Sequence, residues 1–431
     1  MQHTTQTRTS PPIPIIVQQH AEEAAALRHV RSVLVRAPHV KLLQLRRLDD
    51  RLTAQIDGLA VAGEFGTACC TEALEQSTAG PVFAAAVNAI ENRDEPALDR
   101  LHAIAPIVPA AARGLLSAFG WVSAPHLQGL VQQLLGSRDP QRLALGIAAC
   151  RLQQVDPGPV LAAALHATHL PLQAQALHAA GSLGRTDLLP AVRNALKDED
   201  APFEAARALC LLGDHQAALP VLQQHALDGR KDDNGTRLIA LALLLQAAEF
   251  EHARQVVRSA AKTAGGDLAK ERVVLRAIGL LGDVQLVPWL IDRMGDDVQA
   301  RLAGESFSMI TGADLAGLDL ERKPPENPLG GPNDDPDDDD VALDEDESLP
   351  WPDHELVQRW WDAQASRLPA RGRCFIGASP GVEQCEHVLR NGTQRQRIAA
   401  AHYLCVLQPG RKLFNCAAPA WRQQRLLAGI P

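Results

Sequence analysis

Hydrophobic residues recur at three- and four-residue steps along most of this chain. The clearest case lies within residues 39–59, where one such stripe consists of Leu45, Leu48, Leu52, Ile56 and Leu59. That spacing puts the five side chains on one face of a helix. Similar patterns predict helices over about 17–37 and 64–77. Residues 1–15 are polar and interrupted by proline, so we expect a disordered N-terminus followed by N-terminal helices over 16–79.

From about residue 80 the pattern itself repeats. An apolar helix ends in Leu-Gly, a short polar turn follows, and a second apolar helix completes the unit in the segments 176–198, 205–227 and 274–296. Glycine just after a helix favours the left-handed conformation that ends it. The turn glycines are Gly184, Gly213 and Gly282, and less regular copies turn near Gly120, Gln153 and Ala248. A spacing of about 29–35 residues predicts stacked HEAT-like repeats over residues 80–318, since a single helix pair cannot bury its own apolar face.

Composition supports a helical fold and suggests its boundaries. Alanine and leucine dominate the hydrophobic content, whereas Phe, Trp and Tyr together make up 3% of the chain, which favours helices over strands. Proline, glycine and acidic residues crowd 319–350, so we expect a disordered linker there and C-terminal helical layers over 351–431. Thr393 and Gln396 predict a capping box in those layers. The expected fold class is all-α: a HEAT-like α-solenoid, or α-α superhelix, with extra N-terminal helices and a C-terminal helical segment.

The linker contains an acidic run, NDDPDDDDVALDEDES at 333–348. Ten of its sixteen residues are acidic and account for the net charge of −9. The rest of the chain is nearly neutral, so its composition indicates no basic surface for phosphate contacts. As a calcium loop starting at Asp335, the run has Asp340 where the turn needs glycine, and it lacks the final glutamate. We expect a solvated linker, and the alternative is engagement of a basic partner through Asp337, Asp338, Asp339 and Asp340.

Cysteine use and hydropathy indicate the cellular compartment. The eight cysteines form no CxxC pair and lie mostly in apolar helical stretches, which predicts buried, reduced thiols. The first residues lack the apolar run of a signal peptide. The longest apolar run, LIALALLL at 238–245, is far too short to span a bilayer. We therefore expect a cytoplasmic protein without membrane contact.

One motif imitates the nucleophile turn of hydrolases, because GASPG at 377–381 fits G-x-S-x-G. The residue after Ser379 is Pro380, which has no backbone N–H to donate to an oxyanion. No aspartate follows it in the sequence to orient a histidine. We predict instead that Ser379 caps a helix whose first residue is Pro380.

Histidine and cysteine groups do not form a convincing metal site. The most suggestive set has the spacing C-x-H…H-x-x-C and consists of Cys385, His387, His402 and Cys405. These residues lie within predicted helices, whereas structural zinc favours pairs on tight turns. Glu249 and His252 form one E-x-x-H, but a di-iron site needs two. We expect no catalytic, cofactor-binding or metal-binding residue and no cofactor.

The residues that remain as candidates for contact with a partner are surface side chains and two adjacent tryptophans. The side chains fall on the predicted second helices of the repeats and are Gln132, Arg193, Gln224, Arg254 and Arg293. Trp360 and Trp361 point about 100° apart on a helix. They either pack against the repeats or offer an aromatic anchor to a partner.

Several segments together resemble an uncharacterised proteobacterial family of HEAT-repeat proteins. They are QHAEEAAALRHVRSVLVRAPHVKLLQLRRLDDRL with IDGLAVAG, the junction AGESFSMITGADL, LPWPD…VQRWW after the acidic run, and NGTQRQRIAAAHYL…PGRKLFN…APAWRQQRL at the end. The resemblance covers nearly the whole chain. Members of that family have no assigned activity, and genes like them lie near type VI secretion components, beside spike-associated, adaptor-like and effector genes. The resemblance implies an accessory role in secretion and carries over no catalytic residue.

We therefore expect a non-enzymatic, protein-binding HEAT-repeat scaffold, an adaptor or chaperone of an effector or spike component of bacterial type VI secretion. One alternative is an immunity protein that binds and blocks a secreted toxin. Alternatives of other classes are a HEAT-like nucleic-acid-binding or base-repair scaffold, which needs a basic stripe, and an enzyme that uses Ser379 or the histidines. The expected partner is a protein, and we expect neither a membrane nor nucleic acid.

Overall fold

A computed structural model describes residues 11–197, 202–227, 235–325 and 346–429. The chain divides into two compact units. Unit 1 consists of Met1–Val35, Leu43–Pro157 and Ala417–Leu426, and unit 2 consists of Arg36–Leu42, Gly158–Cys416 and Leu427–Pro431. Helices form the regular structure of the described residues, which otherwise contain only four isolated β-bridges. The all-α prediction is confirmed.

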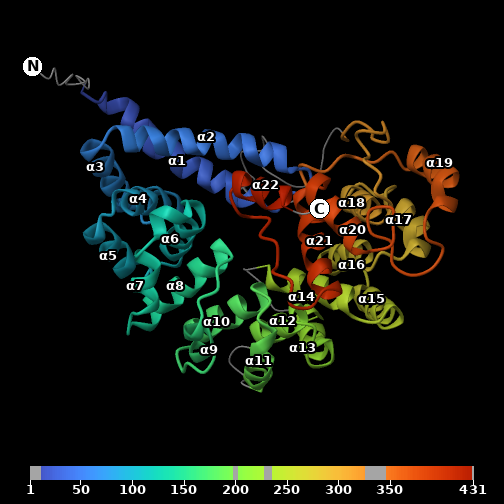
Figure 1. The fold of residues 1–431 in the computed structure, drawn as a ribbon. Coiled ribbons are helices and arrows are strands. Elements are labelled where there is room, and N and C mark those ends of the chain that lie inside the picture. The colour runs from blue at the N-terminus through green and yellow to red at the C-terminus, as the bar shows by residue number, and fades with distance from the viewer. Residues whose placement is uncertain (1–10, 198–201, 228–234, 326–345, 430–431) are drawn as a thin grey trace, which may run out of the picture. The chain divides into compact units, whose positions relative to one another are not determined.

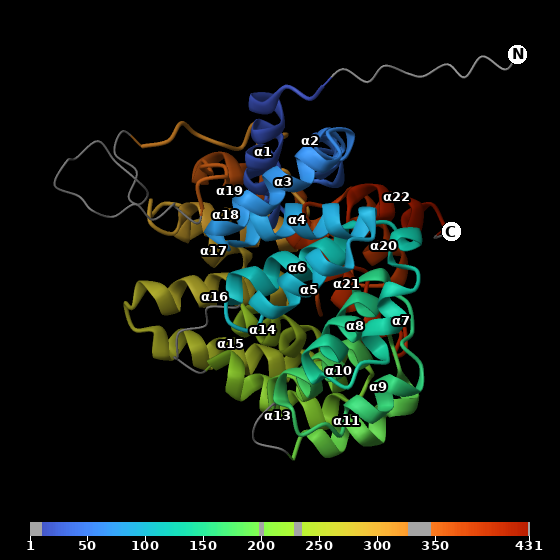
Figure 2. The ribbon, with the colours of Figure 1, turned by 90° about the vertical axis from the view of Figure 1, so that its left-hand side faces the viewer.

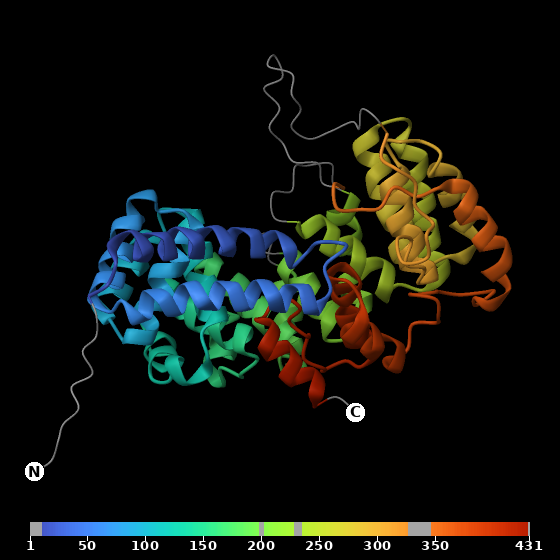
Figure 3. The same cartoon turned by 90° about the horizontal axis from the view of Figure 1, so that it is seen from above.

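Unit 1 begins with two antiparallel helices that lie side by side (Figure 3). Its elements are α1 (Pro14–Leu34), α2 (Leu42–Val61), α3 (Glu64–Glu72), η1 (Ala73–Gln76), α4 (Ala79–Asn92), α5 (Glu95–Ile104), α6 (Pro109–Trp121), η2 (Ala124–Leu127), α7 (Leu130–Leu135), α8 (Pro140–Gln153) and α22 (Ala420–Ala428). The predicted stripe of α2, from Leu45 to Leu59, is buried throughout. It is therefore confirmed as one buried face.

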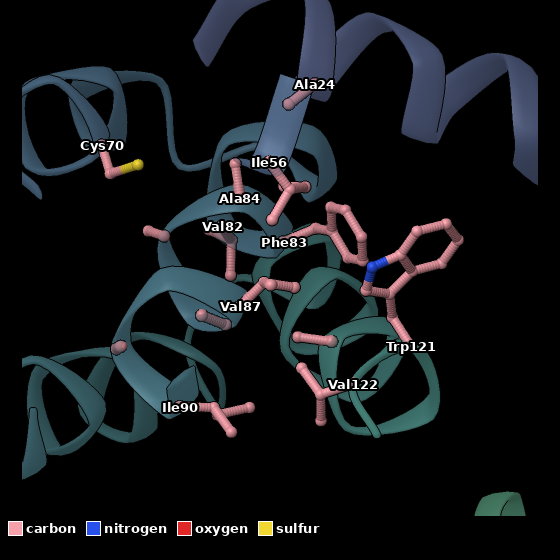
Figure 4. Close-up of a cluster of buried hydrophobic side chains, with 14 of the residues drawn as sticks. Ala24, Ile56, Cys70, Val82, Phe83, Ala84, Val87, Ile90, Trp121 and Val122 are labelled. Carbon is pink, nitrogen blue, oxygen red and sulfur yellow. The ribbon is translucent and has the colours of Figure 1, made fainter. Parts of the chain in front are cut away.

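The core of unit 1 lies where α4 and α6 pack together, with α1 against α4 (Figure 4). Phe83 of α4 meets Trp121 of α6 edge to face, with ring centroids 5.9 Å apart. This geometry is one that aromatic pairs prefer. Arg31 of α1 lies over the same tryptophan ring, 5.4 Å from its centroid, so one aromatic side chain connects three helices.

Helix α22 joins unit 1 through polar contacts. Arg422 donates to the carbonyl oxygens of Gly120, Trp121 and Val122 at 2.9, 3.4 and 2.9 Å. These carbonyls belong to the C-terminal end of α6, where a helix lacks internal donors and favours a cation. Burial, with the nearby arginines, lowers the pKa of Arg422 to about 10, so its guanidinium stays charged at neutral pH.

Unit 2 contains the regular copies of the repeat. Its elements are α9 (Pro159–Ala164), α10 (Leu170–Ser182), η3 (Thr186–Leu188), α11 (Leu189–Ala195), α12 (Pro202–Leu211), α13 (His215–Leu227), α14 (Thr236–Ala247), α15 (Phe250–Ala264), α16 (Leu268–Leu281), η4 (Val284–Leu286), α17 (Val287–Arg293), α18 (Ala300–Thr311), α19 (His354–Gln364), η5 (Ala365–Arg367), α20 (Val382–Asn391) and α21 (Gln394–Leu407).

Helices of unit 2 pack in sequential pairs (Figures 1 and 2). The first helices of the repeats pack next to one another in chain order, and they are α10, α12, α14, α16 and α18. The second helices contact these first helices and are α11, α13, α15 and α17. Unit 1 has the same sequential packing, with α4 against α6 and α6 against α8. This arrangement is consistent with a helical repeat.

The predicted turn glycines have the left-handed conformation, with φ of 68° at Gly184, 93° at Gly213 and 73° at Gly282. The structure adds a second reason for glycine, because residues 373–413, here named the covering segment, run across these turns. A Cβ at Gly213 would lie 2.8 Å from Pro409, and one at Gly282 would collide with the carbonyl oxygen of Cys374. The covering segment also includes α20 and α21, and α21 packs on α12 and α14.

The predicted helix start at Ser379 and Pro380 is wrong, because α20 begins at Val382 after Gly381. The chain is instead turned towards α18, where Ile376 donates its N–H to the carbonyl of Met309 at 2.9 Å. This contact between distant parts of the chain overrides the local capping signal. The capping box of α21 is confirmed, with the Thr393 N–H donating to Gln396 Oε1 at 2.9 Å.

The predicted linker, residues 319–350, has a buried residue at each described end: Leu320 is 7% exposed and Asp346 is 2% exposed. Its flanks also pair with each other, because the Arg322 N–H donates to the Trp351 carbonyl at 2.8 Å. The expectation of a disordered linker therefore fails at these two ends. Asp337, Asp338, Asp339 and Asp340 lie outside the described residues.

Candidate functional site

All five polar residues proposed as contacts lie on second helices. Gln132 is on α7 of unit 1, and the other four belong to unit 2, with Arg193 on α11, Gln224 on α13, Arg254 on α15 and Arg293 on α17. Two of these residues, Arg193 and Arg254, contact other parts of the chain. Gln224 and Arg293 belong to exposed regions of the surface.

Arg193 links its own repeat to the next one. Its Nε and Nη2 donate to Asp214 Oδ2 at 2.8 and 2.5 Å. Asp214 comes directly after the turn glycine Gly213. Its other carboxylate oxygen accepts a longer bond, at 3.4 Å, from the N–H of Ala217 at the start of α13. The same carboxylate therefore serves both a helix start and the contact between repeats.

Arg254 makes the equivalent contact two helix pairs later. Its Nε lies 2.8 Å from Asp283 Oδ2, and Asp283 comes directly after the turn glycine Gly282. Asp283 Oδ1 accepts the N–H of Gln285 at 3.1 Å. The Leu-Gly-Asp turn thus carries an aspartate that pairs with an arginine of the preceding second helix. Both arginines therefore connect consecutive repeats, and their contact with a partner stays a prediction.

Gln224 remains exposed and lines an open groove between α13 and α15. The groove has a volume of about 480 Å³ and is lined by Gln216, Leu219, Pro220, Gln223, Gln224, Leu227 and His252. Amide side chains can donate and accept hydrogen bonds at once, and apolar side chains lie between them. A lining of this kind suits an extended polypeptide segment better than a charged small molecule.

Arg293 belongs to a second exposed region, on α17. Its guanidinium lies over the ring of Trp289, 5.5 Å from the centroid, and this tryptophan is 39% exposed. A groove of about 470 Å³ runs nearby between α17 and α19 and is lined by Pro288, Ile291, Asp292, His354, Glu355, Gln358 and Arg359. Exposed tryptophan and arginine are the residue types most enriched at protein-binding hot spots.

Trp360 and Trp361 both contact Phe307 of α18, with centroid distances of 5.6 and 6.5 Å. Trp361 is only 8% exposed, and Trp360 is half-buried. These rings attach α19 to the last repeat, which is the first of the two roles considered from the sequence.

The groups with chemical potential are dispersed or buried. All eight cysteines are buried, and burial raises the pKa of each thiol, to about 12 at Cys385 and Cys405. Protonated thiols of this kind are poor nucleophiles and poor metal ligands. Within the described ranges, no three or more His, Cys, Asp or Glu side chains are placed to hold a metal ion.

The interface between α21 and the first helices is unusually polar. Arg207 of α12 and His402 of α21 are both buried, and each has a ring or guanidinium nitrogen without a hydrogen-bond partner. Burial, and then the charge of Arg207, lower the pKa of His402 to about 3. Gln246 of α14 donates to the Ala399 carbonyl at 3.2 Å. The histidine is therefore neutral, which avoids placing two cations side by side.

A carboxylate at the end of the acidic run is bound by arginines of the repeats. Arg272 of α16 donates through Nη1 and Nη2 to the two oxygens of Asp346, at 2.6 and 2.9 Å. Burial alone would raise the pKa of Asp346, but Arg272, Arg276 and Arg301 more than offset it, so the pKa lies below its usual range. Sequence reasoning missed this site, because the two residues that form it are 74 positions apart in the chain.

Comparisons with known proteins add no relative. No protein-family model, no curated protein and no solved structure matches this chain. In the part of the chain that the structure describes, no helix has the length and apolar character needed to cross a bilayer.

Proposed function

We propose that this protein is a non-enzymatic, protein-binding scaffold built as a HEAT-like α-solenoid. The observation that carries the proposal is the recurring link between repeats, Arg193 with Asp214 and Arg254 with Asp283. The two links hold the helix pairs that they join in register. The second helices are then a fixed surface along which a partner can bind without a conformational change in the array.

The groove between α13 and α15 is the proposed contact region. It combines exposed Gln224 and His252 with the apolar side chains of Leu219 and Leu227. Each helix that lines the groove is tied to its outer neighbour, since the Arg193–Asp214 link joins α11 to the start of α13 and the Arg254–Asp283 link joins α15 to the turn before α17. Helices held in this way lose little conformational entropy when they bind a partner.

The biological role that we propose is that of a cytoplasmic accessory protein of type VI secretion, acting as an adaptor or chaperone for an effector or spike component. This part rests on the sequence resemblance. An immunity protein that blocks a toxin is the second candidate, because the same groove would serve to occlude another protein.

A pull-down from the native cell tests the proposal. We expect the tagged wild-type chain to retain a specific protein. The double substitution Gln224→Arg with His252→Arg should reduce that retention at least ten-fold, because it adds bulk and positive charge to the groove. A matched control adds the same charge to exposed positions of α15 outside the groove, with Gln255→Arg and Ser259→Arg.

Recovery of spike or sheath components would support the adaptor role, and recovery of a single toxin would support immunity or chaperoning. The absence of any specific protein, or equal loss of retention in the control variant, would contradict the proposed binding surface.

A further inference from the structure

Arginines from two neighbouring first helices converge on the chain that follows the acidic run. Arg272 and Arg276 lie one turn apart on α16, and Arg301 lies on α18. All three act electrostatically on Asp346, and Arg272 holds its carboxylate with two parallel hydrogen bonds of 2.6 and 2.9 Å. A fork-to-carboxylate contact of this type is directional and specific for a planar acidic group.

A second anchor follows five residues later. The guanidinium groups of Arg301 and Arg322 both lie over the ring of Trp351, 4.5 and 5.3 Å from its centroid. Stacking on arginine is a specific mode of aromatic recognition. Arg301 therefore takes part in both anchors, since it faces the carboxylate and the tryptophan ring.

Backbone pairing completes the contact. The Trp351 carbonyl accepts the N–H of Arg322 at 2.8 Å, and the Asp353 N–H donates to the Leu320 carbonyl at 2.9 Å. Between the anchors, Leu349 is 7% exposed. Residues 346–353, with the sequence DESLPWPD, are thus held as a bound peptide is held, by a carboxylate clamp, an aromatic stack, an apolar contact and short backbone pairing.

We propose that Arg272, Arg276 and Arg301 form a recognition site for an acidic protein segment that carries an aromatic residue a few positions further on, and that residues 346–353 occupy this site as an internal ligand. The inference rests on the proposed protein-binding function and names the chemistry of one partner. Such a partner competes with Asp346 and Trp351 for the same arginines.

The choice of a charged anchor supports recognition over simple attachment. Removing a carboxylate and a guanidinium from water is costly, and a buried ion pair is often no more stabilising than apolar side chains of the same volume. Its advantage is specificity for one chemical group. The side chain of Arg272 is 27% exposed, whereas that of Asp346 is 3% exposed, so solvent reaches the site from the arginine side.

The test uses the full chain and a fluorescent peptide with the sequence DESLPWPD as the probe. The variant Asp346→Asn with Trp351→Ala weakens the internal ligand, and we expect it to bind the probe at least ten-fold more tightly than wild type. Adding Arg272→Gln and Arg276→Gln to that variant should abolish binding. Adding Arg258→Gln, an exposed arginine of α15, should leave binding unchanged. A probe with Asn in place of Asp and Gln in place of Glu should bind weakly.

Two results would overturn the proposal: no gain in affinity when the internal ligand is weakened, or binding that survives the loss of Arg272 and Arg276. Circular dichroism establishes that each variant is folded, and Asp346→Asn alone replaces the double variant if the double variant is not folded.

Failure of this test is distinguishable from failure of the proposed function. A cellular partner that is retained equally by wild type and by Arg272→Gln with Arg276→Gln would refute this inference and leave the scaffold role intact.

Discussion

Asp283 lies 2.8 Å from the guanidinium of Arg254, and the two residues belong to consecutive repeats. The same relationship joins Asp214 to Arg193. In both cases the aspartate follows the glycine that ends a first helix. Each aspartate therefore has two roles, because one carboxylate oxygen accepts an N–H at the start of the next helix and the other pairs with the arginine of the preceding second helix.

Replacing Asp283 by Ala should lower the free energy of unfolding by about 1–3 kcal/mol, because it removes a helix cap and leaves Arg254 without its buried partner. Urea unfolding measures the change. The matched control is Asp292→Ala, whose carboxylate pairs with Arg293 but is 66% exposed. That substitution should lower the free energy of unfolding by less than about 0.5 kcal/mol. If the two variants lost the same stability, the link between repeats would stabilise the protein no more than an exposed ion pair.

Gly282 is required both for its positive φ and for the close approach of the covering segment, and a comparison of Gly282→Ala with Gly266→Ala separates these two reasons. Gly266 has a similar positive φ, 86° against 73°, but a Cβ there would meet nothing within 4 Å. Gly266→Ala should therefore cost only about 1 kcal/mol, for the left-handed backbone. Gly282→Ala should cost more, because its Cβ collides with the carbonyl of Cys374.

Hydrogen exchange provides the second readout for this pair of variants. Gly282→Ala should reduce the protection of the amides around Cys374 and Phe375, whereas Gly266→Ala should not. If both variants lost the same stability and kept that protection, the covering segment would not depend on close approach to the turn.

Acid should destabilise unit 2 through His402. Its pKa of about 3 in the folded protein lies below the ordinary value of 6.5, so the unfolded chain binds the proton first as the pH falls. The stability contribution is therefore complete above pH 6.5 and is lost progressively towards pH 3, by at most about 1.4 kcal/mol for each pH unit.

The measurement is the difference between wild type and His402→Gln in thermal unfolding from pH 7 to pH 4.5, where most carboxylates remain ionised. Wild type should lose more stability over this range than the variant. Parallel curves for the two proteins would mean that the histidine is not buried beside Arg207 in solution.

Arg422→Ala should destabilise unit 1 by about 2–3 kcal/mol, because it leaves the carbonyls at the end of α6 without a charged donor. Arg425→Ala is the control, since Arg425 is exposed on the same helix and lies over Trp421. It should cost less than about 1 kcal/mol. Chemical denaturation followed by tryptophan fluorescence would report both, and a control as damaging as Arg422→Ala would contradict the capping role.

The sequence predicted those features that depend on local spacing. The stripe of α2, the left-handed turn glycines and the capping box at Thr393 all follow from residues within one or two helical turns. The pairing of Arg272 with Asp346 joins residues 74 positions apart, and no local pattern encodes it. The failed prediction at Ser379 has the same origin, because Ile376 bonds to a distant helix and delays the start of α20.

The covering segment also sets an order of events during synthesis. The turns at Gly184, Gly213 and Gly282 leave the ribosome well before residues 373–413, which pack over them. Early repeats therefore stand with exposed turns and an uncovered α12–α14 surface while translation continues. Incomplete chains that stop before residue 373 would keep this surface open to solvent, and incompletely packed chains of this kind associate wrongly with one another or are bound by chaperones.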